Sequence, residues 1–239
     1  MSRHPRSDTY DEAWQLSTVM GPNVLWLTEA LCEKVTLQAG QRVLDLGCGK
    51  AASSIFLARE FGVTVWAADI WISPTDNAAR IDASGLNDRV FPVYGEAHRL
   101  PFAHEYFDAI VSLDAFHYFG TDDTYLPQLT PFLRLGGTLG IVVPGVREEL
   151  DVTPEYFLDG LNSFHSPAWW QRHWIRSGGV TDVEADWVPD GWADWLAWHE
   201  RCQETGSSPL PHMADAELAM LRADKGRLLG FTRVVARRA

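Results

Sequence analysis

Short apolar runs and amphipathic stretches alternate along the first 145 residues of the chain. Apolar runs typical of buried strands cover residues 43–46, 63–69, 87–94, 107–113 and 138–143. Helical patterns cover residues 24–37, 51–61, 74–83 and 122–134. Regular alternation of strands and helices predicts an α/β fold with a doubly wound parallel sheet.

The pattern becomes less regular after Pro144. The stretches 146–180 and 189–226 lack the steady alternation and are interpreted as insertions. Helices are expected within these insertions at residues 167–177, 192–204 and 215–224. Two further strands are expected after them, at residues 181–188 and 227–236. The length of 239 residues fits a single domain, 1–239, with sizeable insertions.

A glycine-rich turn, Asp45-Leu46-Gly47-Cys48-Gly49, follows the first strand. Glycine lets the backbone turn sharply and approach a ligand, and the next helix points its free N–H groups at the turn. A nicotinamide site would show G-x-G-x-x-G instead, without a carboxylate two residues before the first glycine. Because a carboxylate suits an ammonium group better than a pyrophosphate, the turn indicates a nucleoside carrying an amino acid, which is S-adenosylmethionine.

Two more carboxylates follow strands at the same edge of the predicted sheet. Asp69 ends the second strand, about 20 residues after the glycine turn, where this fold places an acceptor for both ribose hydroxyls. Glu96 follows the third strand and is a candidate acceptor for the adenine amino group. Acids at the ends of three successive strands favour a bound nucleoside over ordinary loop residues.

With these motifs the chain resembles class I S-adenosylmethionine-dependent methyltransferases, in the small-molecule (type 11) branch that includes ubiquinone and menaquinone C-methyltransferases. The matching segments, within about residues 20–145, are VLDLGCGKA, AADIW, GEAHRLPF, FDAIVSLDAFHYF and LTPFLRLGGTLGIVVPG. The resemblance implies a Rossmann-like, mostly parallel sheet of seven strands, the last inserted antiparallel between the fifth and sixth. It also implies an N-terminal segment and helix (1–38), a cofactor-binding core (39–145) and insertions, 146–180 and 189–226, that cap the active site.

The cofactor implied is S-adenosylmethionine, with S-adenosylhomocysteine as its product. The residues expected to bind it are Asp45, Gly47, Cys48, Gly49, Asp69, Ile70, Trp71, Glu96, Ala97 and Asp114. Trp71 either covers one face of the adenine or packs under its loop. Ala51 replaces the third glycine usual in the family, and alanine is small enough for binding to survive. Residues 1–19 are expected to be ordered in part, over the cofactor.

The end of the fourth strand faces the position from which a methyl acceptor approaches. Methyl transfer is an in-line displacement, and an acceptor that carries a proton needs a base. His117 is the candidate base because a neutral imidazole takes up a proton near pH 7, and Tyr118 is the candidate to orient the acceptor. The competing interpretation is that His117 only shapes the pocket.

Tryptophan is concentrated in the insertions, since seven of the 11 fall between Trp169 and Trp198. This rigid, apolar ring suits a pocket wall for a flat ring or an alkylated cation. The residues expected to contact the acceptor are Phe116, His165, Trp169 and Trp192. Trp170 and Trp174, four apart on one helix, are expected to pack on the sheet.

The composition of the chain disfavours several classes of binding partner. The net charge of −12 disfavours nucleic acid and anionic membranes, and the (D/N)-P-P-Y motif of base-methylating enzymes is absent after the fourth strand. Cys32, Cys48 and Cys202 form neither a metal-binding spacing nor an even disulfide set, so no metal is expected. No apolar run reaches the ~18 residues of a membrane span, and the first ten residues lack a signal-peptide core, so a cytoplasmic protein is expected.

Together these features predict a methyltransferase that acts on a small acceptor, aromatic or cationic. The alternative is an S-adenosylmethionine-binding protein with altered chemistry, or one that senses the molecule without methyl transfer. A nicotinamide-dependent oxidoreductase is least favoured, because of Asp45 and the short glycine turn.

Overall fold

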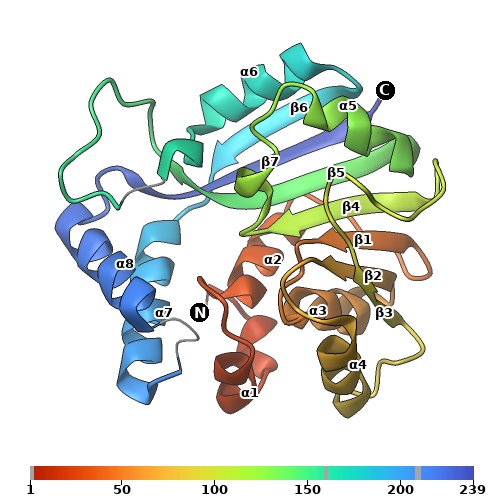
Figure 1. Cartoon of the computed structure of the whole chain (residues 1–239), viewed down its shortest axis with the longest axis horizontal. Helices are drawn as coiled ribbons and strands as arrows, with labels where there is room; N and C mark the ends of the chain where they lie inside the picture. The colour runs from red at the N-terminus through yellow and green to blue at the C-terminus, as the bar shows by residue number, and fades with distance from the viewer. Residues whose placement is uncertain (1–2, 159–160, 208–210) are drawn as a thin grey trace.

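Seven strands form one sheet in the computed structural model of the protein, which describes residues 3–158, 161–207 and 211–239 (Figure 1). Their order across the sheet is β3-β2-β1-β4-β5-β7-β6. In chain order the strands β1 to β7 span Arg42–Leu46, Thr64–Asp69, Val90–Tyr94, Phe107–Leu113, Leu133–Val146, Val180–Trp187 and Leu229–Arg238. β1 to β5 pair in parallel, and β7 pairs antiparallel with both β5 and β6. The predicted mostly parallel, doubly wound sheet with an inserted last strand is confirmed.

Helices cover both faces of this sheet (Figure 1). One face carries α2 (Val24–Cys32), α3 (Ala52–Phe61) and α4 (Pro74–Ala83), and the other carries α5 (Tyr125–Leu129) and α6 (Pro167–Ser177). α7 (Gly191–Thr205) and α8 (Pro211–Asp224) pack on each other beside the carboxyl end of β4, and we call them the cap helices. The remaining elements are η1 (Ser7–Thr9), α1 (Glu12–Ser17), η2 (Phe116–Tyr118), η3 (Thr130–Phe132) and η4 (Leu161–Ser163).

An apolar core lies on each side of the sheet, because successive side chains of a strand point to opposite faces. Val43 of β1 is buried with α2 and α3, whereas Leu44 and Leu46 are buried with α5 and α6. Trp170 and Trp174 of α6 are fully buried in this second core, as predicted.

The region between β4 and β5 differs from the expectation. A helix over 122–134 with a stop at two glycines was predicted, but α5 ends at Leu129 and β5 begins at Leu133. Pro131 has no backbone N–H to donate and its ring crowds the preceding turn, so the chain passes through a short 3₁₀ turn instead. Gly136 and Gly137 therefore lie inside β5.

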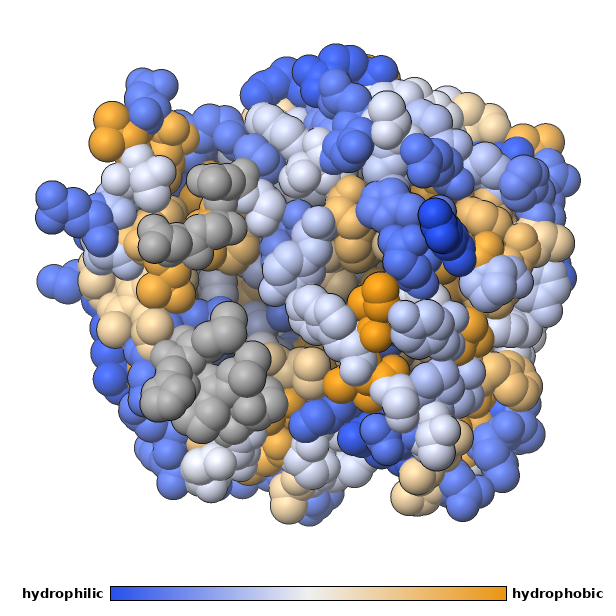
Figure 2. Space-filling view, viewed as in Figure 1, coloured by the Kyte–Doolittle hydropathy of each residue, from blue (hydrophilic) through white to orange (hydrophobic). Residues whose placement is uncertain are grey.

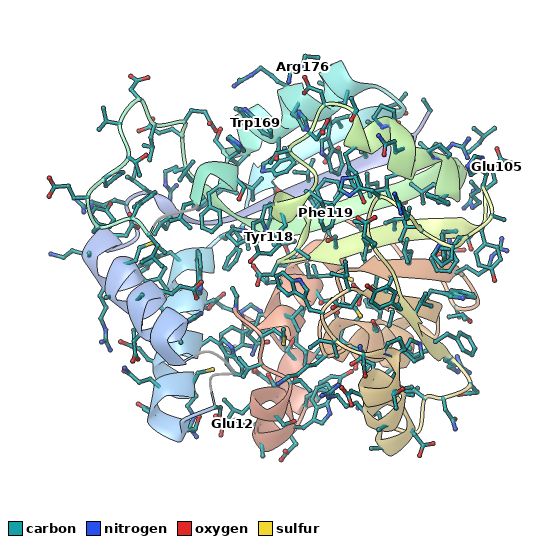
Figure 3. All side chains as sticks on the ribbon, in the orientation of Figure 1. Glu12, Glu105, Tyr118, Phe119, Trp169 and Arg176 are labelled. Atoms are coloured by element: carbon teal, nitrogen blue, oxygen red, sulfur yellow. The ribbon has the colours of Figure 1, made fainter. Side chains whose placement is uncertain are left out.

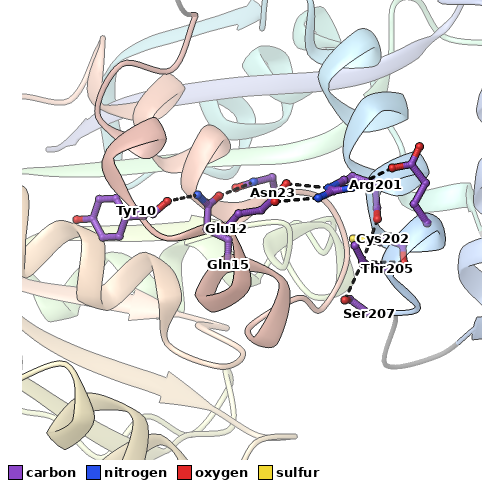
Figure 4. Close-up of polar contacts among 9 residues, drawn as sticks. Tyr10, Glu12, Gln15, Asn23, Arg201, Cys202, Thr205 and Ser207 are labelled. Carbon is purple, nitrogen blue, oxygen red and sulfur yellow. Dashed lines mark hydrogen bonds and ion pairs between the residues drawn. The ribbon is translucent and has the colours of Figure 1, made fainter.

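The N-terminal segment is held onto the domain by a chain of polar contacts (Figure 4). Gln15 Nε2 donates to the carbonyl of Tyr10 at 3.0 Å, and Asn23 Nδ2 donates to Gln15 Oε1 at 3.0 Å. Arg201 of α7 donates to both carboxylate oxygens of Glu12, at 2.7 and 2.9 Å. These contacts join α1 to the start of α2 on one side and to the cap helices on the other.

Candidate functional site

A cavity of about 310 Å³ lies at the carboxyl ends of β1, β2 and β4. Its floor is the turn after β1, and its walls are the loops after β2, β3 and β4. Residues within 15–25 and Trp198 of α7 border it. Figure 2 shows this face of the molecule hollowed to the left of its centre. The predicted cofactor residues that line the cavity are Gly47, Cys48, Gly49, Asp69, Ile70, Trp71, Glu96, Ala97 and Asp114.

The glycine turn fits its predicted place as a bare floor for a ligand. Gly47 and Gly49 have φ of +76° and +54°, in the left-handed region that favours glycine. A Cβ on Gly47 would lie 2.4 Å from the Cβ of Ala115, so no larger residue fits there without displacing the loop after β4. Ala51, where the family usually has glycine, takes the same left-handed conformation with φ of +61° at the start of α3.

Asp69 has a carboxylate that the backbone fixes in place. Oδ2 accepts from the N–H of Gly49 at 2.8 Å, and Oδ1 accepts from the N–H groups of Trp71 and Ile72 at 2.7 and 2.9 Å. An ionised carboxylate accepts about four hydrogen bonds, so about one acceptor position remains, on Oδ2. The group is therefore positioned to receive a hydroxyl of a ribose.

Asp45 lies behind the glycine turn and does not line the cavity. It is fully buried, and its Oδ2 accepts from the hydroxyls of Ser53 and Ser54, both at 2.6 Å. Burial raises the pKa of Asp45 to about 6, against the lowering effect of the two serines. Its Oδ1 has no hydrogen-bond partner among the described residues, which leaves one acceptor available behind the turn. Direct contact with an ammonium group stays a prediction.

The mouth of the cavity carries two aromatic rings from different loops. The rings of Trp71 and Tyr118 are 69% and 63% exposed, and their centroids lie 5.6 Å apart. Desolvation of the Tyr118 hydroxyl, and then the charges of Asp114 and Glu217, raise its pKa to about 12. Glu96 lies on the wall nearby and accepts from both the backbone N–H and the ring of His98, at 3.0 and 2.8 Å.

Asp114 ends β4 in a strained conformation, with φ of +54°. Its backbone N–H donates to the carbonyl of Val142 at 2.8 Å, but its carboxyl makes no hydrogen bond with any described residue. Burial, and then the charge of Glu217, raise the pKa of Asp114 well above its usual range. The cavity wall therefore includes an acid without a counter-charge.

His117, the predicted base, does not line the cavity. Its side chain is almost fully buried, against the rings of Tyr118 and Phe164. Burial lowers the pKa of His117 to about 4, and its Nδ1 finds no partner among the described residues. A charged imidazole would be poorly solvated there, so the geometry does not favour the predicted role as a base.

The four residues predicted to contact the acceptor also lie elsewhere. Phe116 is fully buried in the core with Trp170 and Trp174. His165 and Trp169 stack on each other, with centroids 3.6 Å apart, at the start of α6 (Figure 3). Trp192 donates its Nε1–H to the carbonyl of Leu221 and joins the cap helices. In this structure the four side chains pack against the core, against each other or against the cap, and contact with an acceptor stays a prediction.

The cap side contributes residues that the motifs did not reveal. Trp198 of α7 lines the cavity and donates its Nε1–H to the carbonyl of Gly21 at 3.1 Å.

Phe119 also lines the cavity, beside Tyr118, and both side chains project from the chain that follows β4 (Figure 3). Of residues 1–19, expected to be ordered in part over the cofactor, Gln15, Thr18 and Val19 line the cavity. Cover of a bound cofactor stays a prediction.

Within 3–158, 161–207 and 211–239, no three His, Cys, Asp or Glu side chains come together as a metal site. None of the helices in this part of the chain has the length and apolar character of a membrane span.

Comparison with known proteins identifies relatives over most of the chain. Residues 43–137 match the sequence family described as "Methyltransferase domain". The chain is 31% identical over 215 residues to 27-O-demethylrifamycin SV methyltransferase of Amycolatopsis mediterranei. The aligned region covers 86% of this chain and 77% of that protein. It is 33% identical over 135 residues to methyltransferase GfsG of Streptomyces halstedii, a match that covers 56% of this chain and only about half, 49%, of that relative.

A solved structure with the same fold covers the whole chain. Phosphoethanolamine N-methyltransferase 2 of Haemonchus contortus, in complex with S-adenosyl-L-methionine, superposes with a TM-score of 0.75 over 100% of this chain and 60% of that one. At 18% identity this likeness bears on the fold alone.

Proposed function

The chain belongs to the class I S-adenosylmethionine-dependent methyltransferases, and we propose that it methylates a hydroxyl group of a small, partly aromatic molecule. The cofactor of the family is S-adenosylmethionine, which supplies an electrophilic methyl group on a sulfonium. The observation that carries the proposal is the cavity itself, with a backbone-braced acid on one wall and exposed aromatic rings at its mouth.

The residues present fit the cofactor. Asp69 would hold the ribose hydroxyls, the bare turn at Gly47 and Gly49 would lie under the amino acid portion, and Glu96 and Ala97 would border the adenine. Asp45 Oδ1 leaves an acceptor behind the turn for an indirect contact with the ammonium group. Each of these assignments is part of the proposal.

Two observations support the acceptor class. One relative, which matches 86% of this chain, is named for a substrate with a free hydroxyl, 27-O-demethylrifamycin SV. In this chain Trp71 and Tyr118 form an aromatic mouth, and Lys50 is the one Lys or Arg among the described residues that line the cavity. A hydroxylated aromatic ring therefore suits this opening better than a phosphorylated compound, which would need more cations.

The test is a screen with S-adenosylmethionine labelled in its methyl group and three matched sets of acceptors: hydroxylated aromatic compounds, aromatic amines and organic phosphates. Transfer to the hydroxylated set, with a product one methyl group heavier, is expected. Transfer to amines alone would contradict the proposed acceptor atom. Binding of S-adenosylmethionine with transfer to none of the three sets would favour the alternative of a binding protein without methyl transfer.

A further inference from the structure

One lysine lies among the described residues that line the cavity, and it has no carboxylate partner. Lys50 directly follows Gly49 in the turn after β1, and its side chain is half-buried at the cavity. The same lining includes the acids Asp69, Glu96 and Asp114, yet none of them pairs with Lys50. The ammonium group is therefore a cation without a counter-charge among the described residues.

The ammonium group of Lys50 bonds to the end of α1. Its Nζ donates to the carbonyl of Ser17 at 3.1 Å. Ser17 is the last residue of α1, so its carbonyl has no partner within the helix. Because an ammonium group has three N–H donors, two of them stay available for a ligand while the bond to Ser17 is kept.

The segment 12–21, which contains Ser17, is held between the glycine turn and the cap. A Cβ on Gly49 would lie 3.2 Å from Met20 Cγ, so the side chain of Met20 lies against the turn. On the other side, Trp198 of α7 donates to the carbonyl of Gly21. The bond from Lys50 to Ser17 adds a polar contact on the side of the turn.

A second cation is joined to the same turn through Asn77. Arg80 of α4 donates to Asn77 Oδ1 at 3.0 Å, and Asn77 Nδ2 donates to the carbonyl of Gly49 at 2.9 Å. Burial of Lys50, and then the charge of Arg80, lower the pKa of Lys50. A carboxylate beside Lys50 would oppose both effects, since an opposite charge favours the ionised form. This edge of the turn therefore suits an anionic group of a ligand.

The cofactor proposed for the cavity carries one carboxylate, on its amino acid portion. That portion is assigned to the bare turn at Gly47 and Gly49, so Lys50 is the next residue along the chain. The acids that line the cavity would repel a carboxylate, and Lys50 is the one Lys or Arg in the described lining that would attract it.

We propose that Lys50 binds the carboxylate of S-adenosylmethionine while it holds the carbonyl of Ser17, and so couples cofactor binding to the order of residues 12–21. The inference rests on the cofactor assigned in the proposed function, and it does not depend on the methyl acceptor. It also leaves the described lining without a free Lys or Arg for a phosphorylated acceptor.

The carboxylate can be removed from the ligand as well as the cation from the protein. Decarboxylated S-adenosylmethionine keeps the nucleoside, the sulfonium and the ammonium groups. In calorimetric titration of the full chain, Lys50→Met should bind S-adenosylmethionine about tenfold more weakly than the native protein. The same variant should bind the decarboxylated ligand no more weakly than the native protein does.

Two further variants serve as controls. Lys50→Arg keeps the charge and should bind S-adenosylmethionine within about threefold of native. Lys34→Met removes a lysine that pairs with Glu184 outside the cavity lining, and should match the native protein with both ligands.

Three results would count against the proposal. Equal weakening of both ligands in Lys50→Met would overturn it, because the substitution would then act through the shape of the turn. Unchanged affinity of that variant for S-adenosylmethionine would overturn it as well. A native protein that binds neither ligand would contradict the cofactor assignment itself. Normal binding with failure of every acceptor in the screen would instead count against the proposed methyl transfer alone.

The coupling is tested by amide hydrogen exchange. S-Adenosylhomocysteine has the carboxylate and adenosine lacks it. At equal occupancy of the native protein, S-adenosylhomocysteine should slow exchange of the amides in residues 12–21 about fivefold more than adenosine does. Lys50→Met should lose most of this difference. Equal protection of the native segment by the two ligands would overturn the coupling.

Discussion

Asp69 and Asp114 lie in the same cavity, yet their carboxyl groups are held in opposite ways. Asp69 accepts three backbone N–H groups, whereas the carboxyl of Asp114 accepts none from the described residues. Backbone donors stabilise the ionised form of a carboxylate, and burial without donors favours the neutral form. The cavity thus has one side with an acid fixed by backbone donors, and another side with a buried acid that has no such donors.

The difference separates holding a ligand from reacting with it. A carboxylate fixed by backbone donors needs no rearrangement to receive a ribose hydroxyl, which suits the constant nucleoside part of a cofactor. An unpaired acid costs stability in the empty protein, and such strain is usual where a site awaits charge or a proton. Substitutions on each side test whether the two sides are independent.

The largest effect on stability and on ligand affinity is expected from Gly47→Ala, which changes the glycine turn between the two sides of the cavity. The new Cβ would meet Ala115 at 2.4 Å from a left-handed backbone, so we expect the free energy of unfolding to fall by about 3 kcal/mol. S-adenosylhomocysteine affinity should fall at least ~100-fold. Urea unfolding and calorimetry measure the two quantities. Gly85→Ala is the control, because Gly85 also has positive φ but open space around its Cβ, and should cost only about 1 kcal/mol.

Asp69→Asn tests the braced side alone. The amide keeps the shape but loses the charge and half of the acceptor capacity, so S-adenosylhomocysteine should bind about 30- to 1000-fold more weakly, or 2–4 kcal/mol. Asp76→Asn, in the exposed first turn of α4, should bind normally. Equal affinities for the native protein and Asp69→Asn would remove the ribose assignment.

Asp45, behind the glycine turn, should make the free energy of unfolding depend on pH. Its pKa of about 6 in the folded protein exceeds the unfolded value of about 3.9, so its favourable contribution is complete below pH ~4 and is lost as pH rises through 6. Between pH 4 and 7 the native protein should therefore lose up to about 3 kcal/mol of unfolding free energy relative to Asp45→Asn. Parallel pH profiles of the two proteins would show that Asp45 is ionised throughout.

The smallest effect on ligand affinity is expected from the contact between α7 and the N-terminal segment, where Trp198 bonds to Gly21. Trp198→Phe keeps a large ring but loses the hydrogen bond to Gly21, so S-adenosylhomocysteine affinity should fall about fivefold, or ~1 kcal/mol. Trp192→Phe loses a similar bond to Leu221 away from the cavity and should leave the affinity unchanged. A fall in both variants would mean that the cap acts on the cofactor through its overall stability.

The braced side could be predicted from the sequence because its determinants are local. The β1 turn, Asp69 and Glu96 each follow directly from a strand end, and parallel strands bring their carboxyl ends to one edge. The strands themselves were placed within a few residues, except where Pro131 ended α5 early and β5 extended to meet it.

The side of the cavity that contains Asp114 could not be predicted from local sequence patterns. The helical pattern of α7 predicts a helix but does not say that Trp198 lines the cavity, because that depends on how α7 docks on Gly21. His117 was chosen for its chemistry next to β4, but a 3₁₀ turn rotates it into a dry environment and leaves Tyr118 at the mouth. Tryptophan content likewise indicated an aromatic pocket, while Trp169 and Trp192 are used in packing.

The most direct test of a two-sided cavity is a crystal structure of the chain with S-adenosylhomocysteine bound. We expect the ribose hydroxyls at the Asp69 carboxylate and the sulfur on the Asp114 side of the cavity. A nucleoside bound away from Asp69, or a sulfur that faces away from Asp114, would contradict it.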